Sequence, residues 1–99
     1  MDWSQPAPVL ARRVRAFDPW PGTTTTLDGR GLKVLRARPA GPGGGEPGTV
    51  LRLDRDGVVV ACGEATGLLL LEVHPESKRP MSAASFAAGA RVRVGARFA

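Results

Sequence analysis

The segment Val14-Arg15-Ala16-Phe17-Asp18-Pro19-Trp20-Pro21-Gly22 marks the point at which the chain is expected to change from helix to sheet. Each proline moves the residue before it out of the helical conformation, so Asp18 and Trp20 are expected to be extended. The glycine after the second proline supplies backbone freedom. We therefore predict a rigid elbow at residues 19–22, between a helix and a barrel, with the rings of Phe17 and Trp20 seated against the sheet.

Before the elbow, a helix is predicted from about Pro8, because proline is tolerated in the first helical turn and no breaker follows until the elbow. Leu10, Val14 and Phe17 recur at spacings of four and three residues, which gives the helix one apolar face. The basic side chains that project away from this face are Arg12, Arg13 and Arg15. They form either a solvated helix face or a ridge that contacts phosphates. Upstream, Trp3 is expected to fold back onto the barrel.

After the elbow, the chain is predicted to form short strands joined by turns. The strands are expected at residues 23–27, 32–38, 49–53, 58–62 and 68–73. Asp-Gly pairs at residues 28–29 and 56–57 indicate two hairpins. In the second strand, simple alternation would place Leu32 and Arg36 on the same face, so we expect a bulge or an exit from the sheet near Leu35. Short strands without alternating helices predict a mainly β fold built as a small barrel.

One long connection interrupts the strands. Residues 39–48, with the sequence PAGPGGGEPG, are expected to be a flexible loop without regular structure. They do not match a phosphate-binding loop, because no Gly-Lys-Ser/Thr group opens a helix after them. The uninterrupted run Val58 to Val60 further along indicates a strand that is covered on both faces or lies at a barrel corner.

The C-terminal part contains the signals of a short helix. Ser82 suits the N-cap, and Met81 with Phe86 fits the spacing of a hydrophobic staple. Gly89 suits the residue that stops a helix. Beyond it, residues 91–95 alternate like a short strand that closes the barrel or lies along its edge.

Composition limits the classes of function. Ninety-nine residues suit one domain, and the net charge of +5 comes largely from 12 arginines among 14 basic residues. Arginine pairs with phosphate through two hydrogen bonds, so the excess favours a nucleic-acid partner, although the same excess also occurs on domains that it merely keeps soluble. No apolar run is long enough to cross a membrane, and no signal peptide is evident.

Candidate catalytic groups are few. Cys62 is the one cysteine and His74 the one histidine, so the sequence offers no metal-ligand set and no nucleophile with an oriented base. Within its apolar strand, Cys62 is interpreted as a small buried hydrophobic residue, and a single cysteine is consistent with a reducing compartment. We expect no catalytic residue, no metal and no cofactor in this chain.

Several ordered blocks resemble the C-terminal domain of methionyl-tRNA formyltransferase. They are DWSQPA at 2–7, RAFDPWPG at 15–22, LKVL at 32–35, PGTV at 47–50, VACG at 60–63 and KRPMS at 78–82, with Phe86 and Gly89 after them. The resemblance covers nearly the whole chain. It implies a single domain over residues 1–99, with a lead-in helix and elbow at 1–22 and an OB-like Greek-key barrel at 23–99. The short C-terminal helix belongs to the barrel part.

The resemblance also implies a function. Such a domain would help to hold initiator tRNA in translation initiation, while a separate catalytic domain transfers the formyl group from 10-formyltetrahydrofolate. The chain alone would have no formyltransferase activity, and its location would be cytoplasmic. The residues that we expect to contact the tRNA backbone are Arg12, Arg13, Arg15, Arg36, Arg38, Lys78 and Arg79. The alternatives are a C-terminal domain from a formyltransferase for a sugar nucleotide or a purine precursor, and a structural or partner-docking barrel without RNA binding.

Overall fold

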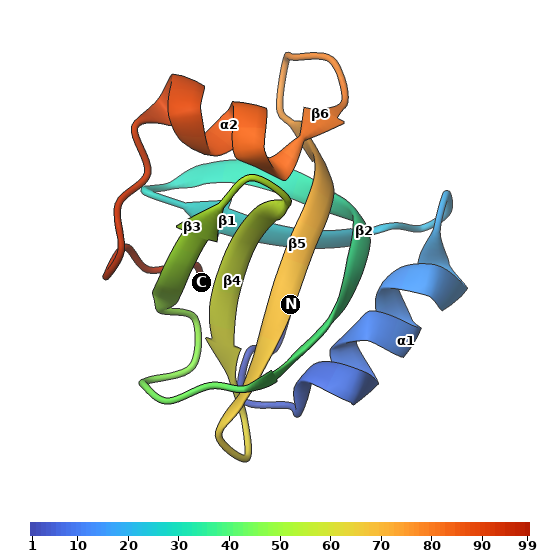
Figure 1. The fold of residues 1–99 in the computed structure, drawn as a ribbon. Helices are drawn as coiled ribbons and strands as arrows, with labels where there is room; N and C mark the ends of the chain where they lie inside the picture. Colours follow the sequence, from blue (N-terminus) through green and yellow to red (C-terminus); the bar gives the residue numbers. More distant parts are fainter.

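One antiparallel sheet of six strands with two helices makes up the protein in a computed structural model that describes residues 1–99 (Figure 1). The elements are α1 (Ala7–Phe17), β1 (Thr23–Leu27), β2 (Arg30–Pro42), β3 (Val50–Asp54), β4 (Gly57–Cys62), β5 (Thr66–Pro75), β6 (Met81–Ser82) and α2 (Ala83–Ala90). The predicted fold class is confirmed: the protein is mainly β, with an N-terminal helix and a short C-terminal helix. Neither helix is long and apolar enough to span a membrane.

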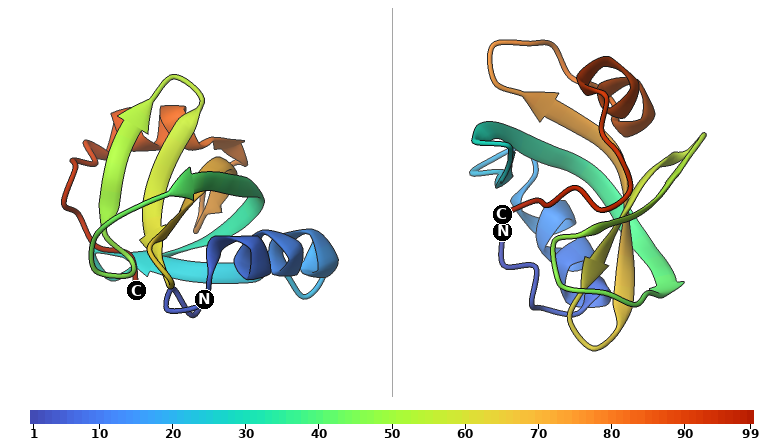
Figure 2. Two further views of the ribbon diagram at one scale, coloured as in Figure 1. Left: turned by 60° about the horizontal axis from the view of Figure 1, so that its bottom comes forward. Right: turned by 90° about the vertical axis from the view of Figure 1, so that its left-hand side faces the viewer.

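The strands follow the order β1-β2-β5-β4-β3, and β6 pairs with β5 beyond the end of β4. Only the β2–β5 pairing joins strands distant in sequence, and Val34 opposite Val73 belongs to this central ladder. The sheet curves strongly, as two further views show (Figure 2), but strand pairing does not close it into a barrel. The two edge strands, β1 and β3, therefore face each other across a gap.

The last residues of the chain fill that gap. Ala99 exchanges backbone hydrogen bonds with Thr26 of β1, at 2.9 and 3.3 Å, and Phe98 N–H donates to Gly48 O, just before β3, at 2.7 Å. The prediction of a strand at residues 91–95 is wrong. The chain turns there, because Arg91 takes a left-handed conformation with φ of 56° after α2, and the bridging residues lie further along.

The predicted bulge in β2 is confirmed. Val34 lies opposite Val73 and Arg36 opposite Glu72, so two residues of β2 advance against one of β5, and Leu35 is the extra residue. The inserted residue reverses the faces of the strand. Leu32 and Val34 are buried before it, whereas Arg36 is exposed after it.

The loop predicted at residues 39–48 begins later than expected. β2 continues to Pro42, with Pro39 opposite Leu68 and Pro42 opposite Thr66, so the expectation of no regular structure is wrong for residues 39–42. The register of the ladder shifts between these two pairs. Proline is compatible with such an irregular strand end, because the missing N–H removes few ladder bonds there.

The core lies inside the curved sheet and draws on both helices. Leu10 and Val14 of α1, Val60 of β4 and Leu68 of β5 are at most 2% exposed. All six residues of β4 are buried, which confirms that the Val58 to Val60 run is covered on both faces.

The N-terminal strap, residues 1–6, is held against this core. Trp3 is 5% exposed, its ring centroid lies 5.7 Å from that of Phe98, and its indole Nε1–H donates to Thr25 Oγ1 at 3.1 Å. The backbone N–H of Gly63 donates to Trp3 O at 3.1 Å. A side chain at position 63 would collide with the carbonyl oxygen of Ser4, so the strap requires glycine there. The prediction that Trp3 folds back is confirmed.

The elbow behaves differently from the prediction. Asp18 is extended, with φ of −89° and ψ of 130°, and Gly22 N–H donates to Phe17 O at 2.8 Å, so a defined turn forms. However, Trp20 is 82% exposed and Phe17 is 39% exposed, so the seating of both rings against the sheet is wrong. The buried side of α1 ends at Val14, and the turn after the helix carries Trp20 into solvent.

The C-terminal helix starts as predicted and ends later. Ser82 Oγ accepts a hydrogen bond from Ser85 N–H at 3.0 Å, which confirms the N-cap. Gly89 does not stop the helix. Arg91, in the left-handed conformation, turns its N–H back toward the last carbonyls and ends α2 instead. The Arg91 N–H thereby satisfies carbonyl oxygens at the helix end, a role that a glycine in the left-handed conformation fills more often.

A candidate nucleic-acid interface

Helix α1 lies alongside β2. At one end, Ala7 N–H donates to Thr66 Oγ1 at 2.9 Å, and Thr66 is the strand partner of Pro42. At the other end, Gly22 lies against the side chain of Lys33, since a Cβ on Gly22 would be 3.3 Å from Lys33 Cδ. The helix and the strand thus run in opposite directions, and their outer residues share one side of the molecule.

This side carries a surface that we call the basic face. Its members are Arg12, Arg13 and Arg15 on α1 and Lys33, Arg36 and Arg38 on β2. On α1, Leu10 and Val14 occupy the inner side, which leaves the three arginines exposed. On β2, the bulge at Leu35 turns the following arginines outward.

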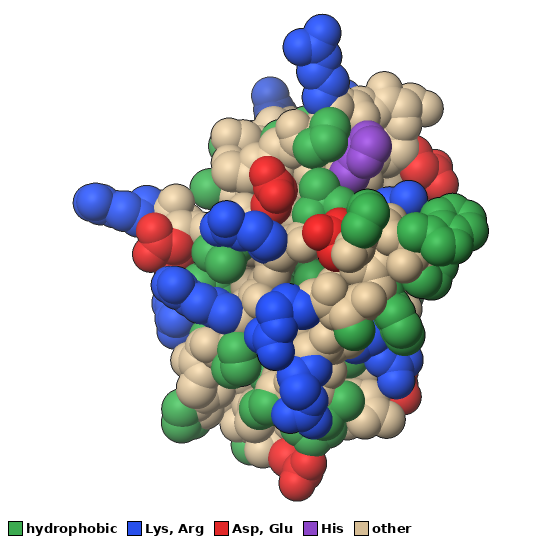
Figure 3. All heavy atoms as spheres, turned by 90° about the vertical axis from the view of Figure 1, so that its right-hand side faces the viewer, with side chains coloured by type: hydrophobic (Ala, Val, Ile, Leu, Met, Phe, Trp, Pro, Cys, Tyr) green, Lys and Arg blue, Asp and Glu red, His purple; other side chains and the backbone are tan.

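Figure 3 looks at the molecule from the side on which α1 lies in Figure 1. Lys and Arg side chains gather there in a band that descends the face, with fewer acidic side chains among them. The single histidine lies on the same face. Since opposite residues of paired strands point to the same side, this agrees with the pairing of His74 on β5 with Lys33 on β2.

The cations of the basic face are not neutralised by ion pairs. The structure contains two salt bridges, Arg52 with Asp54 at 3.4 Å and Arg97 with Glu46 at 3.1 Å, and both lie outside the face. One member has another contact, because the guanidinium carbon of Arg13 lies 5.9 Å from the ring centroid of Phe17. The face therefore presents guanidinium donors that are free to bind an anion.

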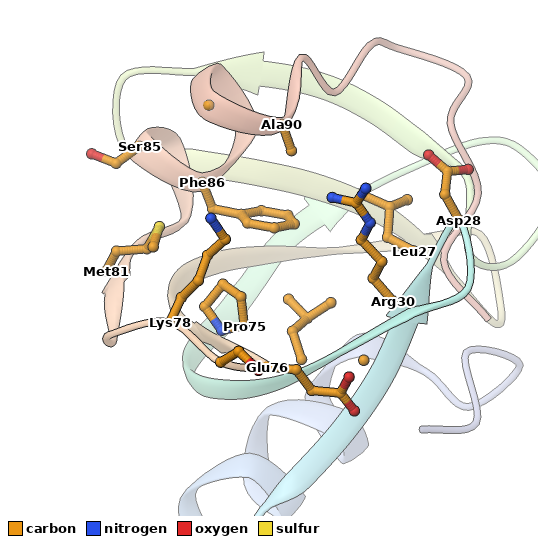
Figure 4. A pocket seen from close by; sticks show the side chains of 14 residues that line it. Leu27, Asp28, Arg30, Pro75, Glu76, Lys78, Met81, Ser85, Phe86 and Ala90 are labelled. Carbon is orange, nitrogen blue, oxygen red and sulfur yellow. The ribbon is translucent and has the colours of Figure 1, made fainter.

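The structure separates the seven predicted contact residues into two groups. Five belong to the basic face, whereas Lys78 and Arg79 lie in the turn between β5 and β6. Lys78 lines a groove of about 570 Å³ between that turn, the β1–β2 turn and α2, together with Arg30 and Phe86 (Figure 4). The turn is tied to β5 by a 2.7 Å hydrogen bond between His74 Nε2 and Lys78 O.

Sequence reasoning missed Lys33, which connects the elbow to the basic face. The signal was present: Leu32 and Val34 are the inward residues of β2, so the residue between them must point outward. Arg30 of the groove was also missed, because its place depends on how α2 packs.

Outside the basic face, burial or hydrogen bonding shifts the pKa of three groups, Cys62, Asp54 and Asp2. Burial raises the pKa of the Cys62 thiol to about 11, so this thiol is protonated at neutral pH. A hydrogen bond from Asp56 N–H lowers the pKa of the exposed Asp54 carboxyl, and bonds from Ser4 do the same for Asp2. No three His, Cys, Asp or Glu residues lie close enough to hold a metal ion. The chemistry that the basic face offers is hydrogen-bond donation from cations.

Comparison with known proteins identifies the family. The sequence profile of the family described as "Formyl transferase, C-terminal domain" matches residues 1–91. The chain belongs to this family. Residues 1–91 extend from the strap through α2, so the match covers the basic face and the groove of this formyl transferase C-terminal domain.

Three relatives of this chain carry the same name. Methionyl-tRNA formyltransferase of Myxococcus xanthus is 53% identical over 95 residues, which are 96% of this chain and 30% of the relative. The Burkholderia multivorans enzyme of the same name is 47% identical over 100 residues, and the Bacillus subtilis one is 40% identical over 96 residues. The chain spans about 30% of the length of each of these three relatives. The family resemblance inferred from the ordered blocks is confirmed.

Proposed function

We propose that this formyl transferase C-terminal domain is a tRNA-binding accessory domain, which positions initiator Met-tRNA for N-formylation in translation initiation. The observation that carries the proposal is the basic face: five arginines on α1 and β2, none in a salt bridge, in a domain whose relatives are named methionyl-tRNA formyltransferase. The proposal places the protein in the cytoplasm, where initiator tRNA is used.

Backbone recognition suits the geometry. A folded tRNA presents phosphates and 2′-hydroxyls along its helical arms, whereas its base edges are poorly accessible in the deep major groove. Arginines on a rigid helix and strand can hold phosphates without reading bases, because such contacts fix register and orientation. In this scheme, the basic face grips an arm and directs the acceptor end away from this domain.

Formyl transfer from 10-formyltetrahydrofolate would then occur in a separate catalytic domain. The relatives are more than three times as long as the matched segment, since the match covers 30% of each. We infer that the remainder carries the reactive groups and that this domain contributes binding energy alone. The Lys78–Arg79 turn, set apart from the basic face, would make a second, weaker contact.

A charge-matched comparison tests the proposal. In one variant, Arg12, Arg13 and Arg15 are all replaced by Gln; in the control, Arg55, Arg91 and Arg93, which also lack salt bridges, are replaced in the same way. Each set removes three charges, so the net charge falls from +5 to +2 in both. We expect the first variant to lose at least about tenfold in tRNA affinity and about two to three units of the log–log salt slope, and the control to lose much less.

Affinity measured by filter binding over a range of salt concentrations gives both quantities. Equal losses in the two variants would show that tRNA responds only to net charge, and the basic face would have no special role. Wild-type affinity that does not change with salt would reject phosphate contacts altogether. Unfolding curves of both variants should match the wild type, because the replaced side chains are exposed.

A further inference from the structure

The elbow leaves an aromatic surface without a partner inside the domain. Trp20 is 82% exposed, and the neighbouring Phe17 is 39% exposed. Pro19 and Pro21 on either side of the tryptophan are exposed as well, so one short turn presents four apolar side chains to solvent. A large aromatic ring gains most of its interaction energy from burial, and a rigid exposed one is typical of an interaction site.

The position of the elbow indicates what would cover it. The N-terminal amine donates to Thr24 O at 2.7 Å, two residues after the elbow ends at Gly22. The family is described as the C-terminal domain of formyl transferases, and the match covers 30% of the Myxococcus xanthus relative, so the larger part of that relative lies outside it. A domain that precedes this segment is therefore tethered beside the elbow, where its effective concentration is high.

We propose that the elbow surface, formed by Phe17, Pro19, Trp20 and Pro21, docks onto the catalytic domain of the full-length enzyme. This inference rests on the proposed function in one respect, namely that a catalytic domain works beside this one. The partner surface would be an apolar hollow that receives the indole ring, with an acceptor for the indole N–H at its rim.

Charge favours a protein surface over an RNA base as the occupant. Asp18 adds an exposed carboxylate two residues before Trp20, and this charge would repel the phosphate of a nucleotide stacked on the ring. One α1 cation, Arg13, already lies over the ring of Phe17. Lys33 is the basic-face cation that lies against the elbow, beside Gly22. The elbow itself, residues 19–22, contains no cation, whereas single-stranded nucleic acid requires a groove lined by several.

Residue-specific oxidation tests the docking. The test uses a hybrid protein, which is the Myxococcus xanthus relative with its 95 matched residues replaced by this chain. Hydroxyl-radical footprinting with mass spectrometry gives the oxidation rate of each tryptophan in the hybrid and in the isolated chain. We expect the rate at Trp20 to fall by roughly tenfold in the hybrid, toward that of the buried Trp3, because burial excludes the radical. Val94, which is 63% exposed on the C-terminal tail, serves as the internal reference and should not change.

Two variants sharpen the result. Trp20→Glu in the hybrid should restore the oxidation of Phe17 to the rate of the isolated chain, whereas Trp20→Phe should keep most of the protection. In the isolated chain, Trp20→Glu should unfold at the wild-type temperature.

An unchanged rate at Trp20 in the hybrid would overturn the docking. Protection that arises only after tRNA is added would assign the ring to RNA and would also overturn it, while the proposed function would stand. Conversely, protection in the hybrid together with no tRNA binding would keep the docking and reject the proposed function.

Discussion

The two tryptophans of this protein lie beside the same strand and meet opposite environments. Trp3 is 5% exposed, with its indole N–H bonded to Thr25 of β1, whereas Trp20, three residues before β1, is 82% exposed. Trp3 lies in a strap whose backbone is fixed by Gly63 of the neighbouring turn. Trp20 lies in an elbow whose turn is held by the hydrogen bond from Gly22 N–H to Phe17 O at the end of α1.

The difference shows that a rigid aromatic segment has two uses in a small domain. In the strap, burial of the Trp3 ring stabilises the fold, because the ring closes the core near Phe98. The elbow offers a similar area to a partner, and the rigidity from its prolines lowers the ordering cost of binding. Three measurements on the domain itself can break or sharpen this contrast.

The largest effect is expected at the strap. Trp3→Ala should lower the free energy of unfolding by about 3 to 5 kcal/mol, because it removes a buried ring, its contact with Phe98 and the bond to Thr25. Urea unfolding followed by far-ultraviolet circular dichroism measures this loss. Trp3→Phe should lose less, since a ring remains. A Trp3→Ala variant as stable as the wild type would mean that the strap does not belong to the folded core.

An intermediate effect is expected at Cys62, which shares the core cluster with Trp3. Burial raises the pKa of the thiol to about 11 from an ordinary value of 9.0. Between these values the unfolded chain has lost the proton and the folded chain has kept it, so stability falls as the pH rises. The contribution of the protonated thiol to the free energy of unfolding is complete below pH 9. It declines by roughly 1.4 kcal/mol per pH unit up to about pH 11.

Comparing the wild type with Cys62→Ala over this pH range isolates the thiol, because all other titrating groups are shared. The stability of the wild type relative to Cys62→Ala should fall as the pH rises from about 9 to about 11. A difference that is constant from pH 8 to pH 11 would show that the folded chain does not protect the thiol from ionisation.

The smallest effect is expected at the elbow. Trp20→Ala in the isolated domain should change the free energy of unfolding by less than about 0.5 kcal/mol, because the ring has few contacts to lose. The same unfolding experiment serves as the measurement. A loss above about 1 kcal/mol would place Trp20 in the folded core and remove the contrast with Trp3.

Much of the fold could be read from local sequence signals. Thr23–Leu27 and Gly57–Cys62 were predicted within a residue of their bounds, because β-branched residues and Asp-Gly turns act over short distances. The bulge at Leu35 and the cap at Ser82 were equally local. For the candidate interface, alternation and helical spacing identified the five exposed arginines. The same rules did not reveal that the Lys78–Arg79 turn lies apart from them, since that depends on how β5, β6 and α2 pack.

The sequence by itself determined the strands, the cap, the family and the outward direction of the arginines, because each follows from backbone periodicity or from ordered motifs. Only the tertiary structure decided that Trp20 is exposed, that β2 extends to Pro42 and that residues 96–99 lie between the two sheet edges. The physical reason is that burial of a ring or pairing of an edge requires a partner distant in sequence. Where no periodic pattern specifies that partner, only the packed chain shows whether it is present.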